Sequence, residues 1–70
     1  MENIRHLVEK NGTVEVVLEG EDGNAFAIMG RVKRSLNEAR WPREDVQQVL
    51  NEMRAGDYDH LLTVAVRVSQ

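Results

Sequence analysis

Residues 24–56 read NAFAIMGRVKRSLNEARWPREDVQQVLNEMRAG and contain the clearest structural pattern of the chain. The apolar residues in this stretch recur with the 3.6-residue period of a helix on both sides of Trp41-Pro42, which interrupts the pattern. A residue before proline is biased away from helical backbone angles, whereas proline suits the first turn of a new helix. The sequence therefore predicts a helical hairpin, with helices over 24–40 and 42–55 and Trp41 at the corner. The two apolar stripes are Ala25, Ile28, Met29, Val32, Leu36 and Ala39, then Val46, Val49, Leu50 and Met53.

Local signals place the ends of these helices. Asp22 or Asn24 can cap the first helix, because short oxygen-bearing side chains accept hydrogen bonds from its free N–H groups. Asp45 follows Pro42 in the first turn of the second helix, where the dipole favours an acid. Gly56 is a natural stop. Gly30 costs the first helix about 1 kcal/mol relative to alanine, which suggests that another element packs closely there.

The N-terminal segment carries a different pattern. From Ile4 to Leu18 the side chains alternate between apolar and polar, as in a half-buried strand. Between the two halves lies Asn11-Gly12, a strong β-hairpin signal because both positions tolerate positive φ. We therefore expect strands over residues 4–9 and 13–19, joined by a tight turn.

The C-terminal segment fits two elements. Residues 57–60 can form one helical turn, whereas Leu62, Val64, Val66 and Val68 alternate with more polar neighbours as in a strand. We expect one helical turn followed by a strand over 62–68. The predicted fold class is α+β, in the order ββααβ. A small antiparallel sheet, made of the β-hairpin and the C-terminal strand, is covered by the helical hairpin in one domain over residues 1–70.

Length and composition limit the possible roles. With 70 residues, 41% hydrophobic and 30% charged, the chain is a single folded domain rather than a disordered tail. So small a core gains about as much from burial as it loses in chain entropy, and no cysteine is present to staple it. We therefore expect a homodimer or a larger homo-oligomer.

Several classes of site are disfavoured. The absence of cysteine excludes thiolate zinc sites and disulfides, and the sequence carries no convincing metal cluster, cofactor motif or hydrolase signature. We therefore expect no metal, no cofactor and no enzymatic activity. A net charge of −3 argues against a nucleic-acid partner. No apolar run approaches a membrane span of about 18 residues, so we expect a cytoplasmic protein without a membrane partner.

Two segments, EDGNAFAIMG at 21–30 and AGDYDHLL at 55–62, resemble the signatures of a family of short uncharacterised proteins of phages and bacterial mobile elements. In that family the pattern reads D-G-N-A-F, a small residue and glycine, a helical hairpin, and then S-G-D-Y-D-H-L-L. The resemblance covers about residues 20–65, and this chain departs from it with Ala55 in place of serine and with its N-terminal extension. The family has no established activity. The resemblance implies a host-takeover or anti-defence role in the host cell cytoplasm.

One candidate ligand site is the loop Asp22-Gly23-Asn24, which opens a helix. Backbone N–H groups and the helix dipole at such a start can hold an anion, although the same residues are typical of an ordinary capped helix. Arg31 and Arg34 lie one or two turns along, where they can add positive charge to the loop or form a solvated helix face.

Asp57, Tyr58 and His60 belong to the densest cluster of titratable side chains. A carboxylate and an imidazole can perform acid–base chemistry, but capping by Asp57 is the simpler interpretation. Two functions stay open. The first is a non-enzymatic, homo-oligomeric interaction protein that binds a host macromolecule such as a protein. The second is a sponge that sequesters a nucleotide-like anion in a pocket between subunits. The loop over 22–26, Arg31 or Arg34, and residues 57–60 line this pocket.

Overall fold

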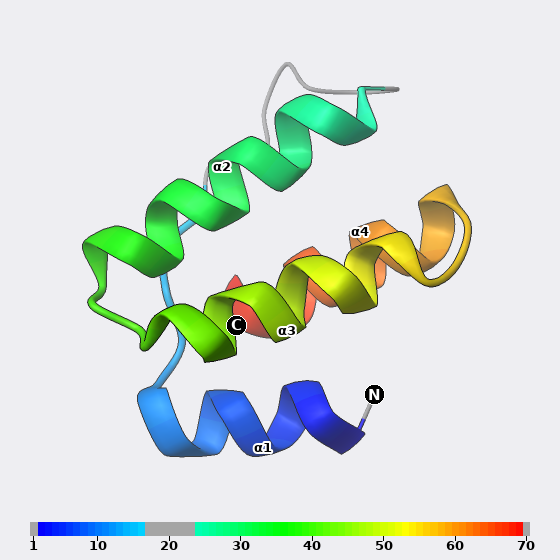
Figure 1. The fold of residues 1–70 in the computed structure, drawn as a ribbon. Helices are drawn as coiled ribbons and strands as arrows, with labels where there is room; N and C mark the ends of the chain where they lie inside the picture. The colour runs from blue at the N-terminus through cyan, green and yellow to red at the C-terminus, as the bar shows by residue number, and fades with distance from the viewer. Residues whose placement is uncertain (1, 17–23, 70) are drawn as a thin grey trace.

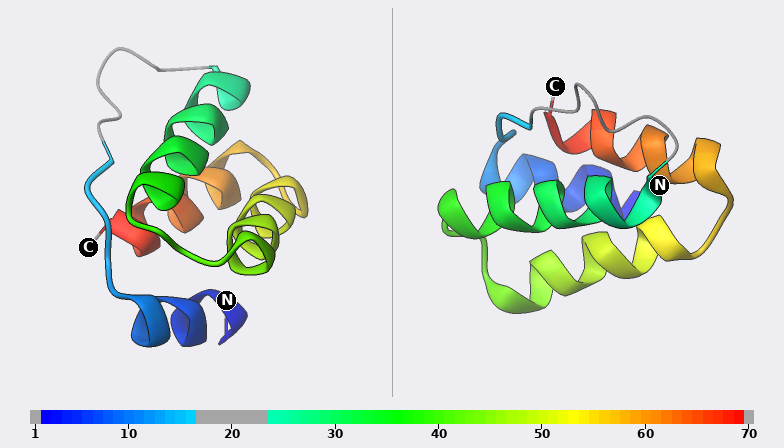
Figure 2. Two further views of the ribbon diagram at one scale, coloured as in Figure 1. Left: turned by 60° about the vertical axis from the view of Figure 1, so that its left-hand side comes forward. Right: turned by 90° about the horizontal axis from the view of Figure 1, so that it is seen from above.

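The computed structural model describes residues 2–16 and 24–69, and these residues form four α-helices and no strand. The helices are α1 (Glu2–Asn11), α2 (Ala25–Glu38), α3 (Arg43–Arg54) and α4 (Tyr58–Ser69). α3 and α4 run antiparallel as a central pair (Figure 1). α2 lies along one side of this pair and α1 along the other, and each contacts both central helices (Figure 2). The described chain is a small helical bundle.

The core forms where the apolar stripes of the helices face one another. In each helix the buried residues are spaced at i, i+3, i+4 or i+7, which places them on one face. The buried apolar residues are Ile4, Leu7, Val14, Ile28, Met29, Val32, Leu36, Trp41, Val46, Val49, Leu50, Met53, Leu61, Val64, Ala65 and Val68. All four helices therefore share one core.

The predicted helical hairpin is confirmed as α2 and α3, with Trp41 buried at the corner. α2 ends in a Schellman motif. Arg40 adopts a left-handed φ of 66° and its N–H donates to the C=O of Asn37 at 3.0 Å, while the N–H of Trp41 donates to the C=O of Leu36 at 3.0 Å. This motif turns the chain and brings Trp41 back over the core.

The expected close contact at Gly30 is wrong. Gly30 is exposed on the outer face of α2. Its own helix aside, no described atom lies within 4 Å of the place that a Cβ would take. Packing against the described residues therefore does not offset the weak helix propensity of this glycine.

The predicted N-terminal β-hairpin is wrong. Residues 4–9 lie within α1, because Ile4, Leu7 and Val8 follow the i, i+3, i+4 spacing of a helix and pack on the core. Gly12 has a φ of 89° and its N–H donates to the C=O of Val8 at 2.7 Å. Asn11-Gly12 therefore ends a helix instead of turning a hairpin.

The predicted second strand is not formed in the part of it that the structure describes. Residues 13–16 have no regular secondary structure, and 17–19 lie outside the described residues. The N–H of Val14 donates to the C=O of Val68 at 2.9 Å. This hydrogen bond and the burial of Val14 hold the segment against the end of α4.

The predicted C-terminal strand is also wrong, since residues 62–68 lie within α4. Leu61, Val64, Ala65 and Val68 are buried at i, i+3, i+4 and i+7, whereas Val66 is 43% exposed. A strand would have placed Val66 on the same face as Val64 and Val68. The α+β class and the ββααβ order are therefore corrected to an all-α bundle. None of the helices in the described ranges combines the length and the apolar character needed to cross a bilayer.

Candidate functional site

Two helices begin at one end of the molecule, and a side chain caps each of them. Asn24 Oδ1 accepts a hydrogen bond from the N–H of Ala27 at 3.0 Å at the start of α2. Asp57 Oδ1 accepts one from the N–H of His60 at 2.9 Å at the start of α4. These caps belong to residues 24–30 and 55–62, which the fold brings together where α2 begins and α3 passes into α4 (Figure 1).

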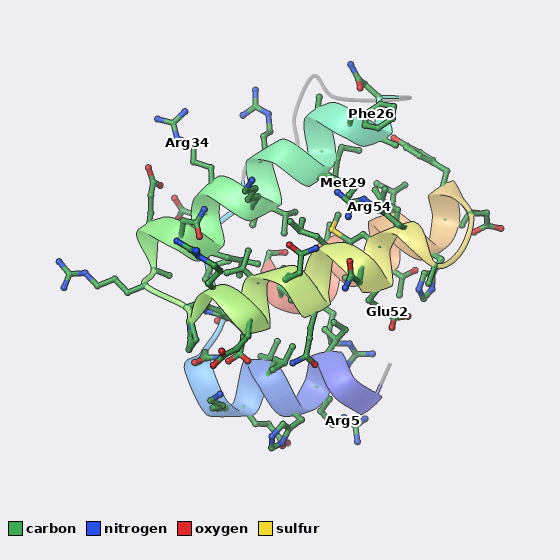
Figure 3. All side chains as sticks on the ribbon, in the orientation of Figure 1. Arg5, Phe26, Met29, Arg34, Glu52 and Arg54 are labelled. Atoms are coloured by element: carbon green, nitrogen blue, oxygen red, sulfur yellow. The ribbon has the colours of Figure 1, made fainter. Side chains whose placement is uncertain are left out.

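A groove of about 370 Å³ lies between these two segments, and we call it the Phe26 groove. Met29, Met53 and Leu61 are buried and form its apolar floor. Phe26 stands at the rim with 86% of its surface exposed. Phe26, Met29 and Arg54 lie at the same end of the bundle (Figure 3). The full lining is Ala25, Phe26, Met29, Met53, Arg54, Gly56, Asp57, Tyr58 and Leu61.

The junction between α3 and α4 is held by His60 and Glu52. His60 Nε2 lies 2.7 Å from Glu52 Oε2, and both side chains are mostly buried. A Cβ added to Gly56 would lie 2.8 Å from Cβ and Cγ of His60, so only glycine leaves room for the imidazole in this position. This packing fixes the turn that carries Arg54 and Asp57 to the rim of the groove.

The predicted acid–base cluster does not assemble as a pair of reacting side chains. Asp57 uses its carboxylate as a helix cap, which confirms the capping interpretation. The ring of His60 faces Glu52 instead of Asp57. Tyr58 is half-buried and lines the Phe26 groove. Of the predicted site residues, Asp57 and Tyr58 thus line the same groove as Ala25 and Phe26 in the first turn of α2.

Arg31 and Arg34 lie elsewhere. They line a hollow of about 550 Å³ between α2 and Glu15, together with Gly30 and Glu38. Arg34 Nε lies 3.4 Å from Glu38 Oε2, and both side chains are exposed, so water screens this pair. Arg34 points away from the bundle (Figure 3).

Within one chain, the two arginines therefore do not share the groove with Asp57 and Tyr58. The predicted loop residues Asp22 and Gly23 lie outside the described residues.

Sequence analysis missed a polar contact that ties α1 to α3. Asp45 Oδ2 accepts hydrogen bonds from Lys10 Nζ at 2.9 Å and from Asn11 Nδ2 at 3.0 Å, and the Asp45 side chain is only 4% exposed. The hydrogen bond from Lys10, with that from Asn11, lowers the pKa of Asp45 below its ordinary value of 3.8. The helix dipole predicted a favourable place for Asp45, but its partners become visible only once residues 4–11 are read as a helix.

Sequence analysis also missed the groove. Its one signal was that Phe26 falls outside the apolar stripe of the predicted helix over 24–40, which implies a large apolar side chain facing away from the core.

Among the described residues, no three His, Cys, Asp or Glu side chains are grouped so that they could hold a metal ion. Comparison of the chain with protein-family models, with curated proteins and with solved structures found no match.

Proposed function

We propose that this chain is a non-enzymatic interaction protein of phage or mobile-element type that binds a host protein in the host cytoplasm. Its binding surface is the Phe26 groove. The observation that carries the proposal is the 86% exposure of Phe26 beside an apolar groove.

The exposure of Phe26 is unusual for this chain, which has one Phe, one Trp and one Tyr. Trp41 is buried and Tyr58 is half-buried, so Phe26 is the aromatic side chain that faces water. Burying such a side chain in a partner contributes roughly 1.5–3 kcal/mol. Aromatic residues and arginine are enriched at protein interfaces, and Arg54 stands on the same rim.

The other surfaces support a partner less well. α2 carries three basic side chains, Arg31, Lys33 and Arg34, and one of them pairs with Glu38, while the net charge of the chain is −3. Nucleic-acid binding needs several phosphates to be neutralised at once, and this charge pattern opposes that. The sponge for a nucleotide-like anion is disfavoured for the same reason, since Glu15 and Glu38 share the hollow with Arg31 and Arg34.

A pull-down from host lysate tests the proposal. Wild-type protein, Phe26→Ala and Val66→Ala are compared, because Val66 is also exposed and apolar but lies on α4 outside the groove. We expect host proteins captured by the wild type to be lost with Phe26→Ala and kept with Val66→Ala. Capture of the same proteins by Phe26→Ala would contradict the proposal.

Thermal-shift measurements with nucleotides test the sponge. A shift that disappears in both Arg31→Ala and Arg34→Ala would favour the sponge over protein binding.

A further inference from the structure

The Phe26 groove carries both halves of an interface on one surface. The projecting part is the Phe26 side chain, which is 86% exposed in the first turn of α2. The receiving part is the floor of Met29, Met53 and Leu61 directly beside it. A two-fold dimer interface has this property, because the same patch on each copy must supply a projection and accept one.

From this self-complementarity we propose that the occupant of the groove is a second copy of this chain. Each copy inserts its Phe26 side chain into the groove of the other. The inference rests on the proposed function in that it names an occupant for the same surface. A host protein would then bind by competing with the second copy.

The size and chemistry of the groove suit a phenylalanine ring. At about 370 Å³ it lies near the lower end of the range for small-molecule pockets, roughly 300–1,000 Å³, so it accepts one large side chain rather than a whole helix. Two of its floor residues, Met29 and Met53, have flexible thioether side chains that adapt to an aromatic ring and make favourable sulfur–aromatic contacts.

The charges on the rim are also self-complementary. Arg54 ends α3 and the exposed Asp57 begins the turn into α4, so the rim carries one cation and one anion three positions apart. A two-fold axis reverses the order of these residues in the second copy. Arg54 of one copy can therefore face Asp57 of the other, whereas a rim of one sign would repel itself.

The expected dimer is weak. Nine residues line the groove, whereas a stable protein interface uses about 20–30 residues from each partner. We therefore expect a dissociation constant of roughly 10⁻⁶–10⁻³ M for the dimer.

Sedimentation equilibrium of the purified chain, at concentrations up to about 1 mM, tests this inference without any host protein. We expect the wild type and Val66→Ala to form dimers, and Phe26→Ala to dissociate at least about tenfold more readily. Because Phe26 is exposed and alanine favours a helix, Phe26→Ala keeps the fold, which circular dichroism verifies. A wild type that stays monomeric, or a dimer unchanged by Phe26→Ala, would overturn the inference.

Charge reversal gives an independent check. Arg54→Glu places like charges opposite each other on the rim and weakens the dimer. Arg43→Glu changes the net charge equally, at an exposed site outside the groove, and leaves the dimer unchanged. Equal effects of both variants would show that net charge rather than rim pairing governs association, which contradicts the assigned contact.

Failure of this inference is distinguishable from failure of the proposed function. A monomeric wild type that still loses its host partners on Phe26→Ala would refute the dimer and retain host binding. If Phe26→Ala keeps both the dimer and the host partners, the dimer and the proposed function are both refuted.

Discussion

At the scale of single residues, α2 carries an exposed glycine in its interior. Gly30 has no described neighbour from outside the helix within 4 Å of its missing Cβ, so alanine fits without displacing anything. We expect Gly30→Ala to raise the free energy of unfolding by about 1 kcal/mol. For a domain of this size that corresponds to a rise in Tm of roughly 4–8 °C, measured by thermal unfolding. A fall in Tm would mean that something packs at Gly30 after all.

Arg40 presents the opposite case at the end of the same helix. Its φ of 66° lies in the left-handed region, which costs a residue with a Cβ roughly 1–2 kcal/mol. The Schellman motif that Arg40 closes prefers glycine there. We expect Arg40→Gly to stabilise the protein by about 1 kcal/mol in chemical denaturation, with Arg43→Gly in the adjacent helix destabilising it as a control. Destabilisation by Arg40→Gly would contradict the assigned cap.

Gly56 is required for a steric reason. A Cβ there would lie 2.8 Å from two carbons of His60, so Gly56→Ala must displace the imidazole from Glu52. We expect Gly56→Ala to destabilise the protein by roughly 1–3 kcal/mol. In a His60→Gly background both of these carbons are absent, and the steric cost of Gly56→Ala largely disappears. A double-mutant cycle measures this coupling, and additive effects would show that Gly56 acts independently of His60.

At the scale of elements, the sequence predicted α2 and α3 correctly because their apolar residues follow the helical period without ambiguity. Trp41-Pro42 marked the boundary between them. These signals are local, so they do not depend on the rest of the chain. The start of α4 was also predicted, by its capping Asp57.

α1 and the rest of α4 were predicted as strands because their patterns fit both periods. In residues 61–68, Val64 and Val68 belong both to the apolar residues that alternate as in a strand and to those that follow the helical period. The abundance of valine, which has a high strand propensity, favoured the strand. The burial of Leu61 and Ala65 against the other helices decides for a helix. Such packing lies beyond local propensity, as does the pairing of Lys10 with Asp45, which are 35 positions apart.

The attachment of α1 to α3 depends on the charge of Asp45. Its pKa is lowered in the folded state by the hydrogen bonds from Lys10 and Asn11. A carboxylate whose pKa is lower in the folded protein stabilises the fold fully at a pH above its pKa in the unfolded chain, about 3.8. This stabilisation is lost as the pH falls through the lower pKa of the folded protein. We therefore expect the stability difference between wild type and Asp45→Asn to shrink below pH 3.8.

Chemical denaturation at pH 7 and in the acid range measures this difference. Lys10→Met is the matched variant, because it removes the main donor while it keeps a long side chain. In the Lys10→Met background, we expect Asp45→Asn to change the free energy of unfolding by less at pH 7, so that its effect depends less on pH. If the gap between wild type and Asp45→Asn is constant from pH 7 to pH 2, Asp45 is not held as a charged group.

At the scale of the whole molecule, the accessible surface is 4,656 Å². A compact monomer of 8.0 kDa is expected to expose about 4,450 Å², so the four helices bury an ordinary share of surface within one chain. The size of the core therefore does not by itself demand a second subunit. Exposed Phe26 and the apolar groove beside it favour association instead.

Photo-crosslinking inside host cells, with the photoreactive amino acid p-benzoylphenylalanine in place of Phe26, reports which molecules contact the Phe26 groove. The same amino acid in place of Val66, on the exposed side of α4, is the matched control. We expect position 26 to form adducts with a host protein and with a second copy of the chain, and position 66 to form few or none. Equal adducts at both positions, or none at position 26, would contradict the assignment of the Phe26 groove as the interaction surface.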